Sequence, residues 1–213
     1  MNHVTVGKMN PLLAAYDGMI PTGPVLFLGV GDGTDIVHLA TRGYAVHAFE
    51  QDAGSIEQAR TLAAAAGVRV EWHHQERCRW RLGFEQWAAI IALFPGWPTG
   101  ERRRLMTAVP NALLPNGSFL FEGYAEGPSG PTSLNDAEID SEDFRAELDV
   151  LHFTRFSTDL RPIRQRPGCP IPTWVLQVVG THLPAGEHDV STLPSSPTRS
   201  AESPERRYSS PAR

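Results

Sequence analysis

Cysteine is scarce in this sequence, with only Cys78 and Cys169 among 213 residues. The two lie far apart and lack metal-ligand spacing, so they support neither a disulfide framework nor a zinc site. The sequence also lacks the charged-then-apolar start of a signal peptide and any run approaching about 18 apolar residues. We therefore expect a cytoplasmic protein with no membrane partner.

An excess of positive charge is absent too. The chain carries 19 Lys and Arg against 24 Asp and Glu, a net charge of −5. An acidic chain has no overall field that favours nucleic acid, so we expect no tRNA, rRNA or DNA partner. The one dense basic run, residues 102–104, is typical of a solvated helix face.

Apolar side chains are almost missing from the C-terminal end. Residues 183–213 are dense in Pro, Ser and charge. Such a segment cannot bury enough surface to offset its ordering entropy, so we expect a disordered tail. Residues 24–182 are expected to form one domain, preceded by residues 1–23 with a short helix.

Strand and helix patterns alternate along the domain. An apolar strand at 25–28 runs into a glycine-rich loop and a helix at 35–42. Further strands are predicted at 44–50, 68–74, 87–93, 118–124, 150–160 and 173–180, and further helices at 55–66, 100–114 and 141–148. The connection between the strands at 150–160 and 173–180 is too short for a crossover helix, so these two strands should form an antiparallel hairpin. The pattern predicts an α/β, Rossmann-like, doubly wound, mostly parallel sheet with a C-terminal antiparallel hairpin.

The glycine loop is the sharpest motif. Gly29, Gly31 and Gly33 follow the first strand and precede a helix, so bare backbone and a helix N-terminus can face a ligand. The dinucleotide fingerprint G-x-G-x-x-G would need glycine at position 34, which is Thr34. The tighter spacing disfavours NAD and indicates a ligand without pyrophosphate.

Two carboxylates follow the next strands. Glu50 ends the strand at 44–50, where it could accept both hydroxyls of a ribose. Glu76 follows the strand at 68–74, where it could meet an adenine amine or simply belong to a polar loop. His73 and His74 are neighbours in that strand and face opposite sides, so we expect no metal site shared by them.

The stretch from VLFLGVGDGTD through FEQD to HHQER resembles motifs I to III of class I S-adenosylmethionine-dependent methyltransferases, nearest the small bacterial tellurite-resistance-type and thiopurine-type branch. The resemblance covers roughly residues 10 to 180. It implies a methyltransferase fold, with S-adenosyl-L-methionine as cofactor and a short N-terminal helix over the cofactor site. The implied cofactor contacts are Gly29, Gly31 and Gly33 with the methionine end, Glu50 with the ribose, Gln51 along the adenine, Glu76 and Arg77 around its amine, and Ala92 beneath the sulfonium.

The sequence departs from this family in two places. Family members carry an acid two positions before the first glycine, and here that position is Phe27. The acid helps to hold the methionine amino group, so its role is lost or passes to Asp32 or Asp35. After the strand at 87–93 the branch has His-Leu-Pro, where this chain has aromatic Phe94 and Trp97.

Residues that contact the methyl acceptor should come from the ends of the strands at 87–93 and 118–124 and from the segments beyond them. We expect Glu122 and Tyr124 as catalytic candidates and Phe94, Trp97 and His152 as substrate contacts. Glu122 would receive a proton or bind a cationic group, or else pair with a nearby arginine, and Tyr124 could instead be packing. The resulting hypothesis is methyl transfer to an N, O or S nucleophile of a small molecule, with an aromatic or heteroaromatic acceptor favoured. The alternative, suggested by Phe27, is a catalytically altered or non-enzymatic relative that acts as a partner subunit or binding module.

Overall fold

The computed structural model describes residues 8–128, 130, 138–163 and 171–184. The predicted tail from residue 185 onward and Cys169 therefore lie outside the described residues. The strands are β1 (Pro24–Leu28), β2 (Ala45–Glu50), β3 (Glu71–His74), β4 (Trp87–Leu93), β5 (Leu113–Tyr124), β6 (His152–Ile163) and β7 (Ile171–Thr181). The helices are α1 (Pro11–Tyr16), α2 (Thr34–Thr41), α3 (Ala53–Ala65), α4 (Thr99–Met106), α5 (Val109–Ala112) and α6 (Ser141–Glu147), with 3-10 turns η1 (Asp17–Met19) and η2 (Arg77–Arg79).

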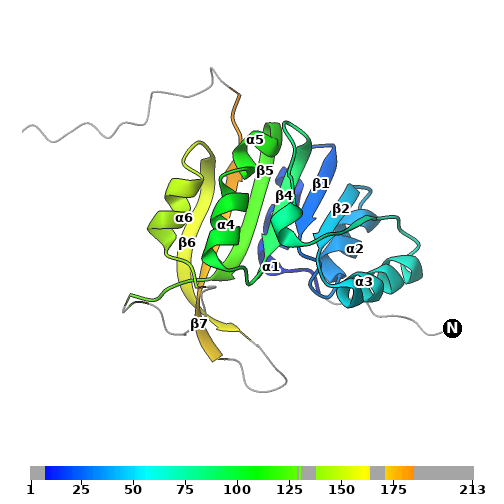
Figure 1. The fold of residues 1–213 in the computed structure, drawn as a ribbon, viewed down its shortest axis with the longest axis horizontal. Helices are drawn as coiled ribbons and strands as arrows, with labels where there is room; N and C mark the ends of the chain where they lie inside the picture. The colour runs from blue at the N-terminus through cyan, green and yellow to red at the C-terminus, as the bar shows by residue number, and fades with distance from the viewer. Residues whose placement is uncertain (1–7, 129, 131–137, 164–170, 185–213) are drawn as a thin grey trace, which may run out of the picture.

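The strands form one seven-stranded sheet in the order β3-β2-β1-β4-β5-β7-β6 (Figure 1). β1 pairs in parallel with both β2 and β4, and the chain order reverses between them. β7 is antiparallel to β5 and to β6. This confirms the predicted fold class. Ligands of such sheets bind beyond the carboxyl ends of the strands at the reversal point, here at the ends of β1 and β4.

The core has two layers, one on each face of the sheet. Alternate residues of β1 divide between them: Val25 and Phe27 pack in the layer with α1, α2 and α3, while Leu26 and Leu28 pack in the layer with α4, α5 and α6. Burial on both faces explains why the parallel strands are almost continuously apolar. None of the helices in the described ranges is long and apolar enough to cross a membrane.

The predicted helix at 100–114 is wrong in its second half. α4 ends at Met106, α5 is a separate short helix, and Leu113 already pairs with Trp87 at the start of β5. The polar turn near Asn116 (φ 63) lies within β5 and coincides with a register shift in the β4–β5 pairing. The local sequence favours a longer helix, but Leu113 is fully buried and pairs with β4. This tertiary pairing gives Leu113 a strand conformation.

The connection between β3 and β4 contains only the short turn η2 where the preceding connections contain helices. Trp80 from this connection is almost fully buried and packs against Phe49 of β2 and Trp97. His47 of β2 and His73 of β3 on the same face stay half-buried.

Candidate functional site

The glycine loop presents bare backbone at the carboxyl end of β1. Gly29 (φ 102) and Gly31 (φ 57) both have left-handed backbone angles, which glycine adopts without steric cost. A Cβ built on either residue would meet no atom within 4 Å. The space in front of these two residues is therefore open, as a bound ligand requires.

Gly33 has a different role in the loop. It also has a positive φ of 82, but a Cβ built on it would lie 2.6 Å from the Cβ of Ala59 in α3. That distance is a steric overlap, so the absence of a side chain allows α3 to pack against the start of α2. The structure thus shows a packing reason for this glycine, apart from the cofactor contact that the family resemblance implies.

Glu50 joins the glycine loop to the end of β2. Its Oε2 accepts a hydrogen bond from the backbone N–H of Val30 at 3.1 Å. Its Oε1 accepts from the backbone N–H groups of Gln51 and Asp52, at 2.7 and 3.0 Å. A carboxylate offers about four acceptor positions. One position on Oε2 is left for a ligand hydroxyl.

The two acids proposed to replace the missing carboxylate both have structural partners. Asp32 Oδ1 accepts from the N–H of Thr34 at 2.9 Å, in the first turn of α2. Asp35 Oδ1 accepts from the N–H of Asn10 at 2.6 Å, and burial raises the pKa of its carboxyl. Phe27 is only 3% exposed and belongs to the apolar core. The position that usually carries an acid is thus part of the hydrophobic layer.

The predicted adenine contacts lie around β3 and η2. Gln51 and Glu76 are exposed, and Glu76 forms an ion pair with Arg79 at 3.4 Å. Arg77 instead pairs with Glu101 of α4, with 2.7 Å between Nε and Oε2. Ala92 is buried near the carboxyl end of β4 and pairs with Phe121 of β5.

The two predicted aromatic substrate contacts are placed differently. Phe94 is half-buried, has a left-handed φ of 47 and packs against Tyr124 with ring centroids 5.1 Å apart. Burial raises the pKa of the Tyr124 hydroxyl, so the group stays protonated. Trp97 is 3% exposed and packs edge-on against Trp80 in the core. Its indole therefore has a packing role in this structure.

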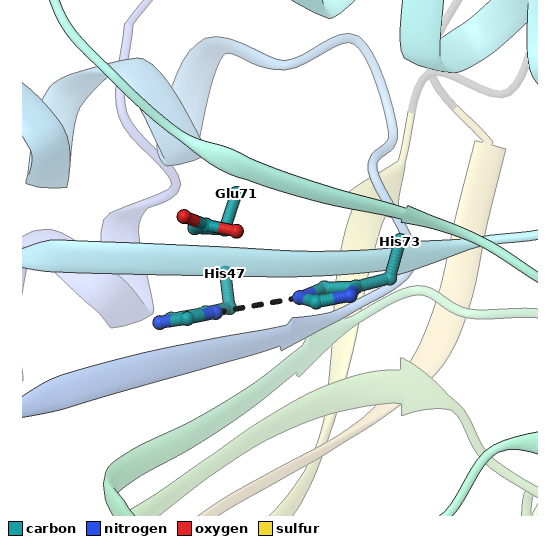
Figure 2. Close-up of side chains that lie close together, drawn as sticks. All are labelled: His47, Glu71 and His73. Carbon is teal, nitrogen blue, oxygen red and sulfur yellow. Dashed lines mark hydrogen bonds between the residues drawn. The ribbon is translucent and has the colours of Figure 1, made fainter.

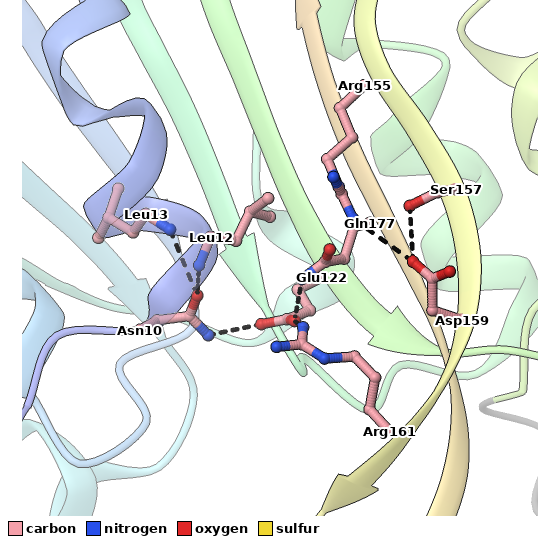
Figure 3. A network of polar contacts seen from close by, with 9 residues as sticks. All are labelled: Asn10, Leu12, Leu13, Glu122, Arg155, Ser157, Asp159, Arg161 and Gln177. Atoms are coloured by element: carbon pink, nitrogen blue, oxygen red, sulfur yellow. Dashed lines mark hydrogen bonds and ion pairs between the residues drawn. The ribbon is translucent and has the colours of Figure 1, made fainter.

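Glu122 lies at the centre of a polar network between the N-terminal segment and the hairpin (Figure 3). The side chain is 2% exposed, and its Oε1 accepts from Arg161 and from Gln177, both at 2.6 Å. Oε2 accepts from the side-chain amide of Asn10 at 2.5 Å. Of the two roles considered for Glu122, the structure shows the pairing with arginine.

The network contains functional candidates that the sequence did not reveal. Arg161 and Gln177 belong to β6 and β7, and neither lies in a recognisable motif. Gln177 is the cross-strand partner of Glu122 in the β5–β7 pairing. In the sequence, Gln177 stands out only as a polar residue within an apolar strand. Its contact with Glu122 depends on the strand register, which the sequence does not give.

The structure contradicts the prediction for His152. This residue begins β6 and pairs with Thr181, which in turn pairs with Ser118 near the start of the parallel part of β5. Since β6 is antiparallel to β7, it runs parallel to β5, and its first residue lies at the amino ends of the strands. His152 is therefore at the edge opposite the glycine loop.

The N-terminal segment contacts both α2 and β5 through Asn10. Asn10 Oδ1 caps α1 by accepting from the N–H groups of Leu12 and Leu13, at 2.8 and 3.3 Å. The same residue contacts Asp35 in α2 through its backbone and Glu122 through its side chain. α1 is thereby attached to the carboxyl edge of the sheet, beside the glycine loop.

Comparison with known families finds a similarity over part of the chain. Residues 25–117 match the family model of the methyltransferase domain. This segment runs from β1 into β5 and includes the glycine loop, Glu50 and Ala92. This part of the chain is therefore similar to methyltransferase domains, in agreement with the predicted enzyme class. No curated protein matches the sequence.

Several solved structures share the fold. TehB from Haemophilus influenzae is 12% identical, with a TM-score of 0.70 over 80% of this chain and 60% of its own. A SAM-dependent methyltransferase from Methanosarcina mazei is 14% identical, with a TM-score of 0.62 over 82% and 98%. The [4+2]-cyclase SpnF is 12% identical, with a TM-score of 0.64 over 80% and 78%. At these identities the likeness concerns the fold.

Proposed function

We propose that this protein is an S-adenosylmethionine-dependent methyltransferase that methylates an N, O or S nucleophile of a small molecule. The observation that carries the proposal is the pairing of an open glycine loop with Glu50. The loop leaves free space in front of Gly29 and Gly31, and the Glu50 carboxylate is bonded to that loop through Val30. The methyltransferase-domain match covers all of these residues.

The residues fit the proposed cofactor. The bare backbone at Gly29 and Gly31 suits the methionine end, and the remaining acceptor position of Glu50 suits a ribose hydroxyl. Gln51 directly follows Glu50 and Glu76 follows β3, and both are exposed, in agreement with an adenine contact. Asp32 and Asp35 are the candidates for the methionine amino group, since Phe27 cannot form an ion pair with it.

S-adenosylmethionine, when bound, supplies an electrophilic methyl group on a sulfonium. The protein's part is to position an acceptor in line with that methyl group and to accept any proton released. Phe94 and Tyr124 offer a half-buried aromatic surface for a planar acceptor. Glu122 already accepts three hydrogen bonds, so in our proposal it orients the acceptor region and any proton transfer to it requires the Arg161 pair to open.

Calorimetric titration of the full chain with S-adenosylmethionine and S-adenosylhomocysteine tests the cofactor assignment. We expect both to bind, Glu50→Ala to weaken binding at least tenfold, about 1.4 kcal/mol, and Glu57→Ala on the exposed face of α3 to leave it unchanged. Gly31→Val should block the loop. Absence of binding of either ligand below about millimolar concentration, near 4 kcal/mol of affinity, would refute the proposal.

A second candidate function is a protein that uses this fold for another purpose, as a binding module, a partner subunit or the catalyst of a different reaction. Burial of Phe27 at the usual acidic position favours it. The fold similarity to a [4+2]-cyclase supports the same idea. Binding of the cofactor without methylation of any amine, thiol or phenol in a broad acceptor panel would favour this candidate. The tellurite-resistance-type and thiopurine-type branch and a cytoplasmic location stay predictions.

A further inference from the structure

Two histidines and a glutamate from β2 and β3 converge on one face of the sheet (Figure 2). His47 of β2 is paired with Glu71 of β3, and His73 lies two residues further along β3. Since side chains alternate between faces along a strand, these three share one face. One ligand atom from each residue can be chosen so that all lie within 4.8 Å of one another.

The distance between the imidazoles matches a shared metal ion. His47 Nδ1 and His73 Nε2 are 3.3 Å apart. Two nitrogens bound to one tetrahedral Zn²⁺ at 2.0–2.1 Å would be separated by about 3.3 Å. The rings are nearly parallel, with an interplanar angle of 11°, so a rotation of the side chains is needed for both lone pairs to meet at one point.

The surroundings hold the histidines while leaving access. The ring of His47 packs edge-on against Trp87, and that of His73 packs edge-on against Phe49. Both imidazoles are half-buried, and Glu71 is exposed at the sheet edge. The β3–β4 connection carries only η2, so an ion could reach this face and keep a water ligand.

We infer that His47, Glu71 and His73 form a binding site for a divalent transition-metal ion of the Zn²⁺ type. Two imidazoles and a carboxylate are a donor set that suits Zn²⁺, and three protein ligands leave one coordination position open. The site is separate from the glycine loop and does not depend on methyl transfer. Because it joins β2 to β3, a bound ion would stabilise the edge of the sheet that also carries Glu50.

The test is titration of the full, untagged chain with Zn²⁺, and with Co²⁺ followed by its visible absorption. We expect one ion per chain, a Co²⁺ spectrum of low-coordinate type, and a melting temperature that rises with Zn²⁺. His47→Gln and His73→Gln should each weaken binding by at least about tenfold, since changes even beyond the direct ligands commonly cost 10–100-fold. The matched control is His152→Gln, which removes an exposed histidine at a distant point of β6 and should bind as the parent does.

Glu71→Gln provides a variant that folds independently of the histidine packing, because the side chain is exposed. It should also weaken Zn²⁺ binding and shift the Co²⁺ spectrum. No Zn²⁺ binding below about 100 µM, or binding that is equal in the parent, His47→Gln and His73→Gln, would overturn the inference. In that case the two histidines form only the imidazole–imidazole hydrogen bond.

Discussion

Asn10 Nδ2 donates a hydrogen bond to Glu122 Oε2 at 2.5 Å, joining residues 112 positions apart in the sequence. The same Asn10 side chain caps α1 through its oxygen. One amide thus uses its oxygen to begin a helix and its nitrogen to attach that helix to the buried end of β5. This contact and the hydrogen bond from the Asn10 N–H to Asp35 together hold the N-terminal segment beside the site.

Substitution of Asn10 separates the two roles. Asn10→Ser keeps an oxygen for the helix cap but loses the amide N–H that reaches Glu122, and should cost about 1.5–3 kcal/mol because the lost bond is to a charged group. Asn10→Asp keeps the cap but places a carboxylate beside Glu122 and Asp35, so it should be the less stable of the two. Urea unfolding measures both. The Asp variant should regain stability in combination with Glu122→Gln, and no such recovery would contradict the contact.

Gly33→Ala should destabilise the protein more than Gly43→Ala does. Both glycines have a left-handed φ, 82 and 91, so alanine costs about 1–2 kcal/mol of backbone strain at either position. At Gly43 a Cβ meets no atom within 4 Å, while at Gly33 it overlaps Ala59. At Gly33 we expect a further loss of about 1–3 kcal/mol in the free energy of unfolding, the cost of inserting an extra carbon into a well-packed core. Equal free energies of unfolding for the two variants would show that α3 can move away freely.

The stability of the protein should depend on pH through Asp35. Burial raises the pKa of this carboxyl above its ordinary value of 3.8, so the folded state holds the proton to higher pH than the unfolded state. The contribution of Asp35 to stability is therefore greatest below pH 3.8 and falls as the pH rises through the native pKa. Asp35→Asn keeps an oxygen for the Asn10 N–H and removes the titration.

The measurement for Asp35 is the difference in free energy of unfolding between Asp35→Asn and the parent across pH 3 to 7. The variant should gain stability relative to the parent as the pH rises, and the difference should level off above the native pKa. Asp52→Asn is the control, because hydrogen bonds from Ser55 lower the pKa of Asp52 and give a slope of opposite sign. A flat difference for Asp35→Asn would contradict the burial argument.

Phe94 and Trp97 should respond differently to truncation. Trp97→Ala removes a buried indole and should cost about 3–5 kcal/mol. Phe94→Gly loses an aromatic contact with Tyr124 worth about 0.5–1.5 kcal/mol but relieves a left-handed backbone angle costing about 1–2 kcal/mol. Its net effect on thermal unfolding should be small. A loss as large as that of Trp97→Ala would show that Phe94 is a core residue and not a surface for an acceptor.

The local pattern was sufficient to predict the strands and the glycine loop, because strand burial and backbone freedom show within a short stretch of sequence. The apolar run ending at Leu28, the glycines after it and the carboxylate of Glu50 follow rules of backbone freedom and strand burial that each short segment obeys by itself. The hairpin was also predictable, since the connection between its strands is too short for a helix.

The tertiary structure decided which side chains meet. Glu122 alone is compatible with a catalytic or a paired carboxylate, and only the register of β5, β7 and β6 brings Gln177 and Arg161 to it. The same register moved His152 to the far edge, and the pairing of β2 with β3 brought His47 to His73 when their neighbours in sequence suggested no such cluster. These contacts join residues far apart in the chain, and a shift of one residue in pairing would reverse the face of every side chain, so no local pattern can specify them.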